Sequence, residues 1–445
     1  MSLSPKWWRS RMMRRSDRKS LRIGIFEGAF NPPHYGHLLC ALFAQQELNL
    51  DFVYFVPLTN PPHKRDALDA NSRFDMVVAA VAENPYFRAS RVAIEHGGTG
   101  YSLMTVEAIH RQHPDAELFY LTSSEYLDPA HKYFLGNWIG GKELFGLCRF
   151  VVFPRGDHKK EQIKQWARLV PQAKIDVVDL YSPPVSSTDI RRLVAEGKSI
   201  RYLTPFDIQT IISRERHYWT ADTPRPNLPA LPTATSKRIA LFGGQFNPIT
   251  YGDLWMAEWL RQKFSWDRVI FVTTAQPPNN RGTELLDAEL RHQMVTAAVA
   301  SNPYFSASRI ELDRRTTSYT YLTIEQMRES FGDEAEINWL VSADYLNPEN
   351  PFYLHKWMGM PQLFDICNFV AFPLNKQHRE LAIGWAEKLK SAYPHAQIEF
   401  VPEAPLPVVS ASLIRRLIEQ DRSIWYTSPW PVQQIINNYK LYRSK

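Results

Sequence analysis

Residues 22–38 read RIGIFEGAFNPPHYGHL, and residues 238–254 repeat the pattern as RIALFGGQFNPITYGDL. In each copy a short apolar run, typical of a buried strand, leads into a loop with glycine and proline and then into a helical segment. The copies differ in chemistry at two positions, because Thr250 stands opposite His34 and Asp253 stands opposite His37. Since imidazoles can hold and neutralise phosphate near neutral pH, this difference predicts one working site and one silent site.

The repetition extends far beyond this loop. Four further pairs of segments match in the same order: NPYF at 84–87 and 302–305, GYSLMTVEAI at 100–109 and SYTYLTIEQM at 318–327, LTSSEYLDP at 121–129 and LVSADYLNP at 340–348, and VSSTDIRRL at 185–193 and VSASLIRRL at 409–417. The period is much longer than the roughly 20–50 residues of stacked repeats. We therefore expect a duplicated domain, with copies at 21–217 and 237–445 joined by a proline-rich linker at 218–236.

Within each copy, predicted strands alternate with predicted helices. In the first copy we expect strands at 22–26, 52–57, 117–123, 149–155 and 174–180, and helices at 38–48, 73–83, 102–111, 159–170 and 188–196. This alternation is typical of a parallel sheet with helices on both faces, so the expected fold class is α/β with two Rossmann-like domains. Such sheets bind ligands beyond the carboxyl ends of their strands, which is where the first strand delivers residues 27–37.

The positive net charge is confined to the N-terminus. Seven of the 52 basic and one of the 46 acidic side chains lie in residues 1–20, so the rest of the chain holds 45 of each. Because residues 21–445 carry no net charge, the sequence argues against a broad nucleic-acid-binding surface. No apolar run reaches the roughly 18 residues that a membrane-spanning helix needs. We expect residues 1–20 to form a disordered arm; a transit peptide, or a partner or membrane contact through Trp7 and Trp8, are the alternatives.

The three cysteines are widely spaced and form no CxxC pair. Cys40, Cys148 and Cys367 therefore predict neither a disulfide framework nor a zinc site, and they fit buried packing positions in a reducing compartment. A cytoplasmic location follows from this interpretation.

Two segments of the first copy carry residue types suited to anions. In the first loop, Gly28 would let the backbone turn sharply and approach an anion, and His34 and His37 could face the same side of a helix entrance. Taken alone, the two imidazoles could bind phosphate, bind a metal or fill buried space. In SSTDIRR (186–192), Ser187 or Thr188 would cap a helix and Arg191 would add a cation one turn later. Together the two segments predict a ligand with several phosphates.

These motifs resemble the nucleotidyltransferases with HxGH and ISSTxIR signatures, and more narrowly the nicotinate-nucleotide or nicotinamide-nucleotide adenylyltransferases. The narrower resemblance rests on TNPPHK (59–64), Arg73 with Met76, GYS (100–102), the acid–Leu pair Glu125 and Leu127, Trp138, and FVVFPRG (150–156). It covers nearly all of residues 21–217.

The resemblance implies transfer of the adenylyl group of ATP to a pyridine mononucleotide, giving a dinucleotide and pyrophosphate in NAD biosynthesis. ATP and the mononucleotide would be the partners, and Mg²⁺ would be held mainly by the phosphates rather than by a protein metal site. The choice between nicotinate and nicotinamide acceptors stays open. A nucleotidyltransferase that uses CTP or a pantetheine phosphate, and a non-catalytic nucleotide-binding protein, are the alternatives.

The resemblance also assigns roles to individual residues. The nucleotide would be bound by Gly28, Ala29, Phe30, His34, His37, Glu125, Ser187, Thr188 and Arg191, of which His34, His37 and Arg191 would be catalytic; the acceptor would be bound by His63, Lys64, Tyr101, Ser102 and Trp138. The family usually has Gly-x-Asp where this chain has Ser123-Ser124-Glu125, so the contact with the ribose is in doubt.

The second copy keeps only part of this set. It retains Asp344, Trp357 and Arg415, and Thr250 is compatible with a working site. Asp253, however, would place a carboxylate beside a polyphosphate, so the second copy is expected to be degenerate. Because the family often self-associates, the two repeats could pack as an internal pseudo-dimer.

Overall fold

The computed structural model describes residues 20–59, 67–96, 101–156, 158–178, 185–224, 232–233, 236–278, 285–406 and 409–443. Nearly all of the expected basic arm and part of the expected linker therefore lie outside the described residues. The contacts divide the chain into two compact units. Unit 1 holds the residues up to Val194, Leu203–Ala221 and Gln420–Ser423, and unit 2 holds Ala195–Tyr202, Asp222–Glu419 and the residues from Ile424 onward.

Unit 1 is built on a six-stranded parallel sheet with the order β3-β2-β1-β4-β5-β6. The strands are β1 (Arg22–Gly28), β2 (Phe52–Pro57), β3 (Phe87–Ala89), β4 (Glu117–Ser123), β5 (Cys148–Phe153) and β6 (Lys174–Val177). The strand order runs outward in both directions from the β1–β4 pair. This is the doubly wound arrangement, in which ligands bind at the carboxyl ends of the two central strands.

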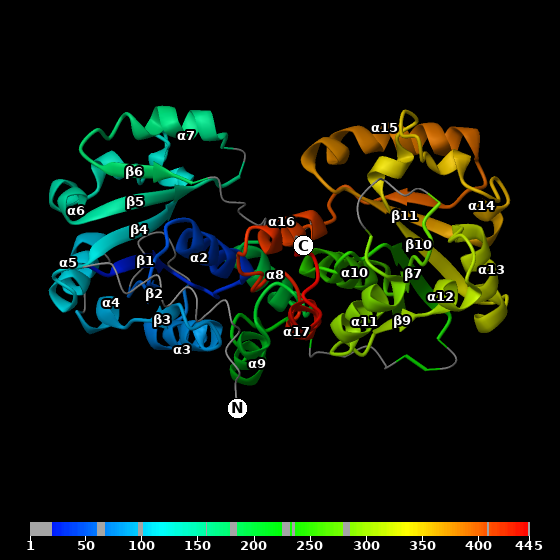
Figure 1. Cartoon of the computed structure of the whole chain (residues 1–445), viewed down its shortest axis with the longest axis horizontal. Helices are drawn as coiled ribbons and strands as arrows, with labels where there is room; N and C mark the ends of the chain where they lie inside the picture. Colours follow the sequence, from blue (N-terminus) through cyan, green and yellow to red (C-terminus); the bar gives the residue numbers. More distant parts are fainter. Residues whose placement is uncertain are drawn as a thin grey trace. The chain divides into compact units, whose positions relative to one another are not determined.

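Helices cover both faces of this sheet (Figure 1). They are α2 (Tyr35–Glu47), α3 (Ala70–Val81), α4 (Val92–Glu95), α5 (Ser102–Gln112), α6 (Gly141–Leu147), α7 (Lys160–Ala167), α8 (Ser187–Ala195) and α9 (Phe206–Glu215), with short 3₁₀ turns η1 (Ser124–Leu127) and η2 (Leu135–Asn137). Side chains of α5, α6 and α7 share one apolar core with Ile23 and Ile25 of β1. On the opposite face, Phe26 packs on Phe55 of β2 and on His37 of α2.

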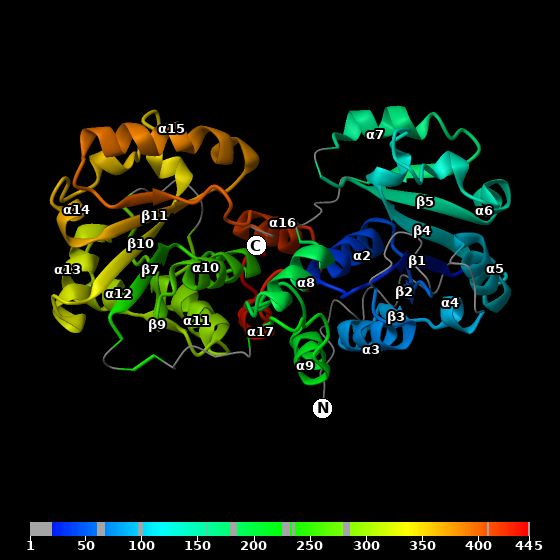
Figure 2. The same ribbon diagram turned by 180° about the vertical axis from the view of Figure 1, so that it is seen from behind.

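Unit 2 repeats the same plan (Figure 2). Its sheet has the order β12-β11-β10-β7-β8-β9, again wholly parallel. The strands are β7 (Arg238–Gly244), β8 (Arg268–Thr273), β9 (Phe305–Ser308), β10 (Glu336–Ser342), β11 (Asn368–Phe372) and β12 (Ile398–Phe400). The helices are α10 (Tyr251–Phe264), α11 (Ala288–Val299), α12 (Ile310–Arg314), α13 (Thr320–Phe331), α14 (Leu363–Ile366), α15 (Lys376–Ala392), α16 (Ala411–Glu419) and α17 (Trp430–Asn438), with turns η3 (Ala343–Leu346) and η4 (Leu354–Lys356). The expected α/β class with two Rossmann-like domains is confirmed.

Several element boundaries differ from the sequence-based expectation. Helix α2 begins at Tyr35 rather than at residue 38, so His37 lies inside its first turn. The short elements β3, α4, α6 and α9 were not expected. Strand β3 and helices α4 and α6 have too few apolar residues for a clear periodicity, whereas α9 has Ile208, Ile211 and Ile212 at helical spacing and could have been predicted. Strand β6 ends at Val177, and residues 179–180 of the expected strand lie outside the described residues.

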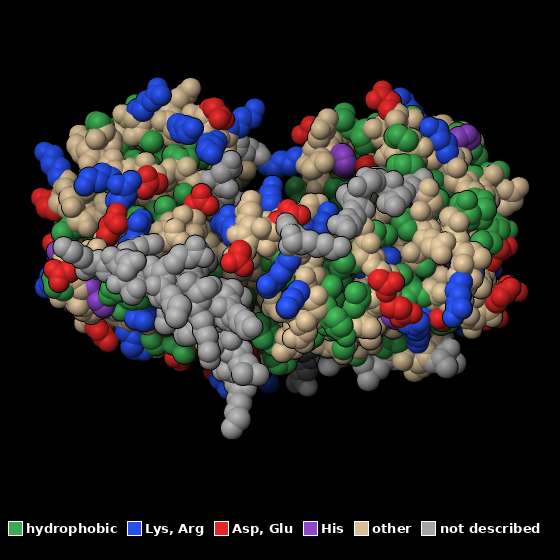
Figure 3. Space-filling model, in the orientation of Figure 1, with side chains coloured by type: hydrophobic (Ala, Val, Ile, Leu, Met, Phe, Trp, Pro, Cys, Tyr) green, Lys and Arg blue, Asp and Glu red, His purple; other side chains and the backbone are tan. Residues whose placement is uncertain are grey.

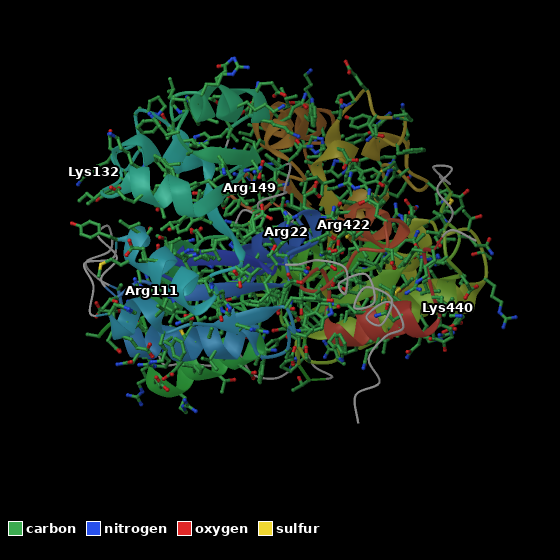
Figure 4. All side chains as sticks on the ribbon, turned by 60° about the vertical axis from the view of Figure 1, so that its left-hand side comes forward. Arg22, Arg111, Lys132, Arg149, Arg422 and Lys440 are labelled. Carbon is green, nitrogen blue, oxygen red and sulfur yellow. The ribbon has the colours of Figure 1, made fainter. Side chains whose placement is uncertain are left out.

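On the face shown in Figure 3, basic and acidic groups are interspersed over the described residues. Arg22 and Arg149, which Figure 4 labels, lie near the amino ends of β1 and β5 and pair with Glu117 and Asp176. These cations are therefore at the edge of the sheet opposite the carboxyl ends. Among the described helices, none is long and apolar enough to cross a membrane.

Candidate functional site

The two histidines of unit 1 form a reciprocal pair at the start of α2. The backbone N–H of His37 donates to Nδ1 of His34 at 3.4 Å, and the backbone N–H of His34 donates to Nδ1 of His37 at 3.3 Å. This is a capping box made of imidazoles. The rings stack with centroids 3.7 Å apart and 26° between their planes.

The capping box fixes the tautomer of both rings. Because each Nδ1 accepts a backbone N–H, the proton of each neutral imidazole is on Nε2. Each neutral ring therefore carries its donor on Nε2, and both rings lie at a helix N-terminus, where the helix dipole favours an anion; His34 is buried and His37 is partly exposed. Of the three uses that the sequence left open, phosphate binding agrees best with two donors at this position.

Glycine is required between the histidines. A Cβ placed on Gly36 would lie 2.8 Å from Nδ1 and 2.9 Å from Cε1 of His34, which is closer than real contacts allow. His37 is also held from the side by the edges of Phe26 and Phe30, with centroids at 6.0 and 5.1 Å. The imidazole pair is thus preorganised by its own helix turn and by the aromatic core beneath it.

The loop before α2 turns at a different residue from the one expected. Gly28 belongs to strand β1 and pairs with Pro57, so it does not make the turn. The left-handed residue is Phe30, with φ 45°, and its ring is almost fully buried. Space at Gly28 is limited, because a Cβ there would lie 3.3 Å from the Phe30 ring, which is a tight contact. The expectation of a sharp turn at Gly28 was wrong.

The second motif meets this loop directly. Ser187 Oγ donates to the carbonyl of Pro32 at 2.8 Å, and Nη1 of Arg191 donates to the carbonyl of Asn31 at 2.8 Å. These contacts span 155 and 160 residues of sequence. The structure therefore brings the HxGH and SSTDIR segments together at the switch point of the sheet.

Helix α8 is capped by a different residue from the expected Ser187 or Thr188. Ser186 Oγ accepts the backbone N–H of Asp189 at 3.1 Å, which makes Ser186 the N-cap. Ser187 is buried, whereas Thr188 is exposed and accepts a 3.3 Å hydrogen bond from Nη2 of Arg191. Thr188 and the Arg191 guanidinium thus lie together at the start of α8.

A buried guanidinium ties together the loops that follow β1 and β2. Arg73 of α3 has no solvent exposure. Its three nitrogens donate to the carbonyls of Ala29, Leu58, Thr59 and Leu68 at 2.6–2.9 Å. Burial lowers the pKa of this guanidinium, but the four carbonyls compensate for its lost hydration. Asn31 is held as well, because its side-chain oxygen accepts from the Tyr218 hydroxyl at 2.8 Å.

The residues expected to bind the acceptor lie at the start of α5 and beside β4. Tyr101 precedes α5 and is exposed, and Ser102 Oγ lies 2.8 Å from the Tyr120 hydroxyl. Trp138 is partly buried, donates from Nε1 to the Tyr133 carbonyl at 2.9 Å and meets Tyr120 edge-on. The expected acceptor ligands His63 and Lys64 lie outside the described residues.

Glu125, expected to contact the nucleotide, lies in turn η1 directly after β4. Its Oε1 is 3.3 Å from Nη1 of Arg155, which follows β5. Ser124 beside it accepts the backbone N–H of Arg155 at 2.9 Å and lies 2.9 Å from Nδ1 of His158. Glu125 is therefore at the carboxyl edge of the sheet, paired with a cation from the neighbouring loop.

Unit 2 keeps the helix start but changes its chemistry. The backbone N–H of Asp253 donates to Thr250 Oγ1 at 3.3 Å, and the backbone N–H of Thr250 donates to Asp253 Oδ2 at 2.8 Å. The Thr250 hydroxyl also lies 2.8 Å from the same carboxylate oxygen and 3.2 Å from the carbonyl of Val409. The side chains that replace the imidazoles thus satisfy each other, and the Nε2–H donors are replaced by a carboxylate. Burial raises the pKa of Asp253 to about 6.

The frame around the second site is nevertheless unchanged. Arg291 repeats Arg73 and donates to the carbonyls of Gln245, Thr274, Ala275 and Leu286. Arg415 repeats Arg191 and donates to the carbonyl of Asn247 at 2.6 Å. Tyr442 repeats Tyr218 on the Asn247 side chain. At this helix start, the units therefore share the surrounding contacts and differ in the capping pair itself.

Sequence reasoning missed two contributors to the first site. Tyr218 closes the loop through Asn31, and it lies just beyond the expected end of the first domain. Glu27 accepts hydrogen bonds from Thr105 and Tyr120 next to Ser102. The signal for Glu27 was available, since the second copy has Gly243 at this position. No group of three His, Cys, Asp or Glu side chains that could hold a metal occurs in the described parts of the chain.

In unit 1, two anion-suited helix starts meet at the switch point of a doubly wound sheet, which is the arrangement typical of nucleotide-binding α/β domains, and unit 2 repeats the fold. The cytidylyltransferase-like family model matches both copies, over residues 25–193 and 241–417. A protein of Clavibacter michiganensis named "Probable nicotinate-nucleotide adenylyltransferase" is 38% identical over 198 residues, which cover 44% of this chain and 94% of that protein. Proteins of the same name from Thermus thermophilus and Exiguobacterium sibiricum are 36% and 35% identical, covering 44% and 45% of this chain and 100% of each relative.

This chain belongs to the cytidylyltransferase-like family and, within it, to the nicotinate-nucleotide adenylyltransferases. Among solved structures, a nicotinic acid mononucleotide adenylyltransferase of Plasmodium falciparum complexed with NaAD has 14% identity and a TM-score of 0.38, over 44% of this chain and 97% of that one. A putative nicotinate-nucleotide adenylyltransferase of Vibrio parahaemolyticus has 19% identity and a TM-score of 0.32, over 44% and 95%.

The buried guanidinium of Arg73 gives a first prediction. Replacing it with methionine in Arg73→Met removes the donors of four carbonyls that converge on a fully buried position, so we expect the free energy of unfolding to fall by roughly 3 kcal/mol or more. Urea unfolding of the full chain measures this loss. The control is Arg111→Met on the exposed side of α5, where a change within about 0.5 kcal/mol is expected. Equal effects of the two substitutions would contradict the structural role of Arg73.

The helix start of unit 2 gives a pH prediction. The folded pKa of Asp253, about 6, lies above the ordinary value of 3.8, so its ionisation costs stability progressively from about pH 4 to about pH 6. Asp253→Asn removes this group, and the stability of the wild-type chain should fall relative to that of the variant over this range. The control variant is Asp69→Asn. Asp69 is an exposed N-cap, and hydrogen bonds from Ser72 lower its pKa. The effect of Asp69 on stability has the opposite sign, because its ionised carboxylate stabilises the fold and this contribution is lost as the pH falls. The midpoint of urea unfolding is measured against pH for the wild-type chain and for both variants. If the two substitutions changed the pH dependence of this midpoint with the same sign, the raised pKa assigned to Asp253 would be refuted.

Proposed function

We propose that unit 1 transfers the adenylyl group of MgATP to nicotinate mononucleotide or nicotinamide mononucleotide, releasing a dinucleotide and pyrophosphate. The observation that carries this proposal is the imidazole capping box of His34 and His37, joined through one loop to Ser187 and Arg191. Membership of the nicotinate-nucleotide adenylyltransferases supplies the reaction class. We place the reaction in the cytoplasm, which agrees with three buried free cysteines.

The reaction needs positioning and charge neutralisation rather than a covalent enzyme intermediate. A phosphate oxygen of the mononucleotide attacks the α-phosphorus of ATP, and the bond from that phosphorus to the bridging oxygen breaks as pyrophosphate leaves. The Nε2–H groups of His34 and His37 would donate to the triphosphate, where negative charge builds up. Thr188 and Arg191 at the start of α8 would bind its β and γ phosphates. Mg²⁺ enters with ATP as part of the substrate.

The acceptor would lie on the other side of the β1–β4 switch point. We assign its ring to Tyr101, Ser102 and Trp138, which the start of α5 and the loop after η2 bring to one end of β4. Glu125 would then lie near the nucleotide at the carboxyl end of the same strand. We assign no such reaction to unit 2, because its Thr250–Asp253 pair offers an acceptor where a donor is needed. We also propose that unit 2 serves unit 1 as a built-in partner.

Exchanging one side chain between the copies tests which copy works. His37→Asp installs the residue of unit 2 and can keep the capping hydrogen bond, so unit 1 should stay folded. The loss of the Nε2–H donor and the added carboxylate should lower kcat by about 10²–10³ or more, measured as pyrophosphate release from ATP and each mononucleotide. The matched change in the other copy, Asp253→Asn, should leave kcat unchanged. Full activity of His37→Asp, or loss of activity in Asp253→Asn, would reverse the assignment.

The choice of nucleotide can be tested separately. The matching family model is described as cytidylyltransferase-like, so a domain of this kind could use CTP instead of ATP. We expect pyrophosphate release with ATP and at most a small fraction of that rate with CTP, with either mononucleotide as acceptor. Binding of ATP without any pyrophosphate release would favour a nucleotide-binding protein instead. A higher kcat/KM with CTP would favour a different transferase.

A further inference from the structure

Strands β4 and β5 of unit 1 are followed by two loops at the same edge of the sheet. The strands are parallel neighbours whose last residues, Ser123 and Phe153, are paired, so both loops begin at the carboxyl edge. The loop after β4 opens with Ser124 and Glu125 in turn η1. The loop after β5 carries Arg155 and runs as far as helix α7. A further group of polar side chains therefore lies at the carboxyl edge, next to the β1–β4 switch point.

The hydroxyl group of Ser124 joins the two loops. Ser124 has no solvent exposure, and its Oγ accepts the backbone N–H of Arg155 at 2.9 Å. The same Oγ lies 2.9 Å from Nδ1 of His158, so the hydroxyl hydrogen can be donated to that nitrogen. The His158 ring in turn meets Trp166 of α7 edge-on at 4.9 Å. The backbone of Arg155 is therefore held from a buried position.

The side chain of Arg155 pairs with the acid of the other loop. Its Nη1 lies 3.3 Å from Oε1 of Glu125, and the side chains of Arg155 and Glu125 are 54% and 30% exposed. Both charged groups are therefore accessible to a bound molecule. Because an ion pair this exposed adds little to stability, folding alone does not explain why a buried serine holds one of its partners.

Unit 2 differs at all three of these positions. It has Ala343, Asp344 and Leu374 where unit 1 has Ser124, Glu125 and Arg155. The hydroxyl of Ser342, which precedes turn η3, donates to the carboxylate of Asp344. The shorter acid is thus held from the end of its own strand, and the side chain of Leu374 brings no charge to it.

The longer acid of unit 1 is held from the neighbouring loop instead, by a cation. A carboxylate close to a nucleotide repels its phosphates, and a guanidinium bonded to that carboxylate removes much of the repulsion. The extra methylene of Glu125, the cation of Arg155 and the buried hydroxyl of Ser124 therefore form one set. This set occurs in the copy that keeps both histidines.

We propose that Arg155 is a positioning residue for ATP in unit 1 and that Ser124 holds it in place. The guanidinium fixes and neutralises the Glu125 carboxylate, so the longer acid of this chain can accept hydroxyl groups of the nucleotide without repelling its phosphates. This inference rests on the proposed function. Arg155 acts through Glu125 and takes no part in the transfer at phosphorus.

The experiment measures kcat and KM for ATP in the full-length chain, at a saturating concentration of the better mononucleotide. Arg155→Leu installs the residue of unit 2 at an exposed position, so the midpoint of urea unfolding should stay the same. We expect KM for ATP to rise about tenfold with kcat within about twofold of the wild type, because the ion pair acts equally before and during transfer. KM for the mononucleotide should not change. Ser124→Ala should raise KM for ATP in the same direction.

A second substitution tests whether Arg155 acts through Glu125. Adding Glu125→Asp to Arg155→Leu copies the acid and the apolar residue of unit 2, and the hydroxyl of Ser123 can then bond the shorter carboxylate as Ser342 does in unit 2. We expect KM for ATP in this double variant to return to within about threefold of the wild-type value. A guanidinium that contacted ATP itself would be missed equally with either acid, so KM would not recover.

The matched control is Ser342→Ala, which removes the hydroxyl that holds the acid of unit 2 and should leave KM for ATP unchanged. Calorimetric dissociation constants for ATP are measured alongside the kinetics. If no pyrophosphate is released, the proposed function fails, and the dissociation constants of the wild type, Arg155→Leu and the double variant still test Arg155. If transfer proceeds while Arg155→Leu keeps the wild-type KM for ATP, or while the double variant fails to recover it, the inference is overturned and the proposed function stands.

Discussion

The site depends on how the first helix after β1 begins. A helix leaves its first backbone N–H groups without partners inside the helix, and both units satisfy two of them with a reciprocal pair of residues three apart. In unit 1 the pair is His34 and His37, and in unit 2 it is Thr250 and Asp253. Because the pair is a structural necessity, its geometry survived duplication, while the chemistry that it presents to a ligand was free to change.

An imidazole is unusual in this position because it has two nitrogens. Nδ1 can satisfy the backbone while Nε2 keeps a proton for a ligand, so one side chain serves the helix and the site at the same time. A threonine hydroxyl and a carboxylate cap a helix equally well, but in unit 2 they bond to each other. The loss of function proposed for unit 2 therefore needs no disruption of its fold, which agrees with the intact contacts of Arg291, Arg415 and Tyr442.

The sequence alone was sufficient for the α/β class, the duplication, and the central strands and helices, because long apolar runs and the repeat are local signals. It placed the two anion-suited motifs but could not show that Ser187 and Arg191 bond to the loop before α2, since those contacts join residues about 160 positions apart. It assigned the turn to Gly28 because glycine permits it, whereas the left-handed residue is Phe30, whose buried ring packs on Phe55. The N-cap of α8 was misplaced by one residue because three consecutive residues, Ser186, Ser187 and Thr188, could each cap.

The two units also differ in where each keeps a buried acid. In unit 1 the acid is Glu27 on β1, beside Tyr120; in unit 2 position 243 is glycine, Trp339 fills the space, and Glu311 on α12 bonds the equivalent threonine. These substitutions are coupled, because Trp339 leaves no room for a side chain at 243. Restoring histidines at 250 and 253 would therefore repair the triphosphate end of the second site only. The end facing α13 is packed as core around Trp339, so the loss of function proposed for unit 2 involves two physically separate differences.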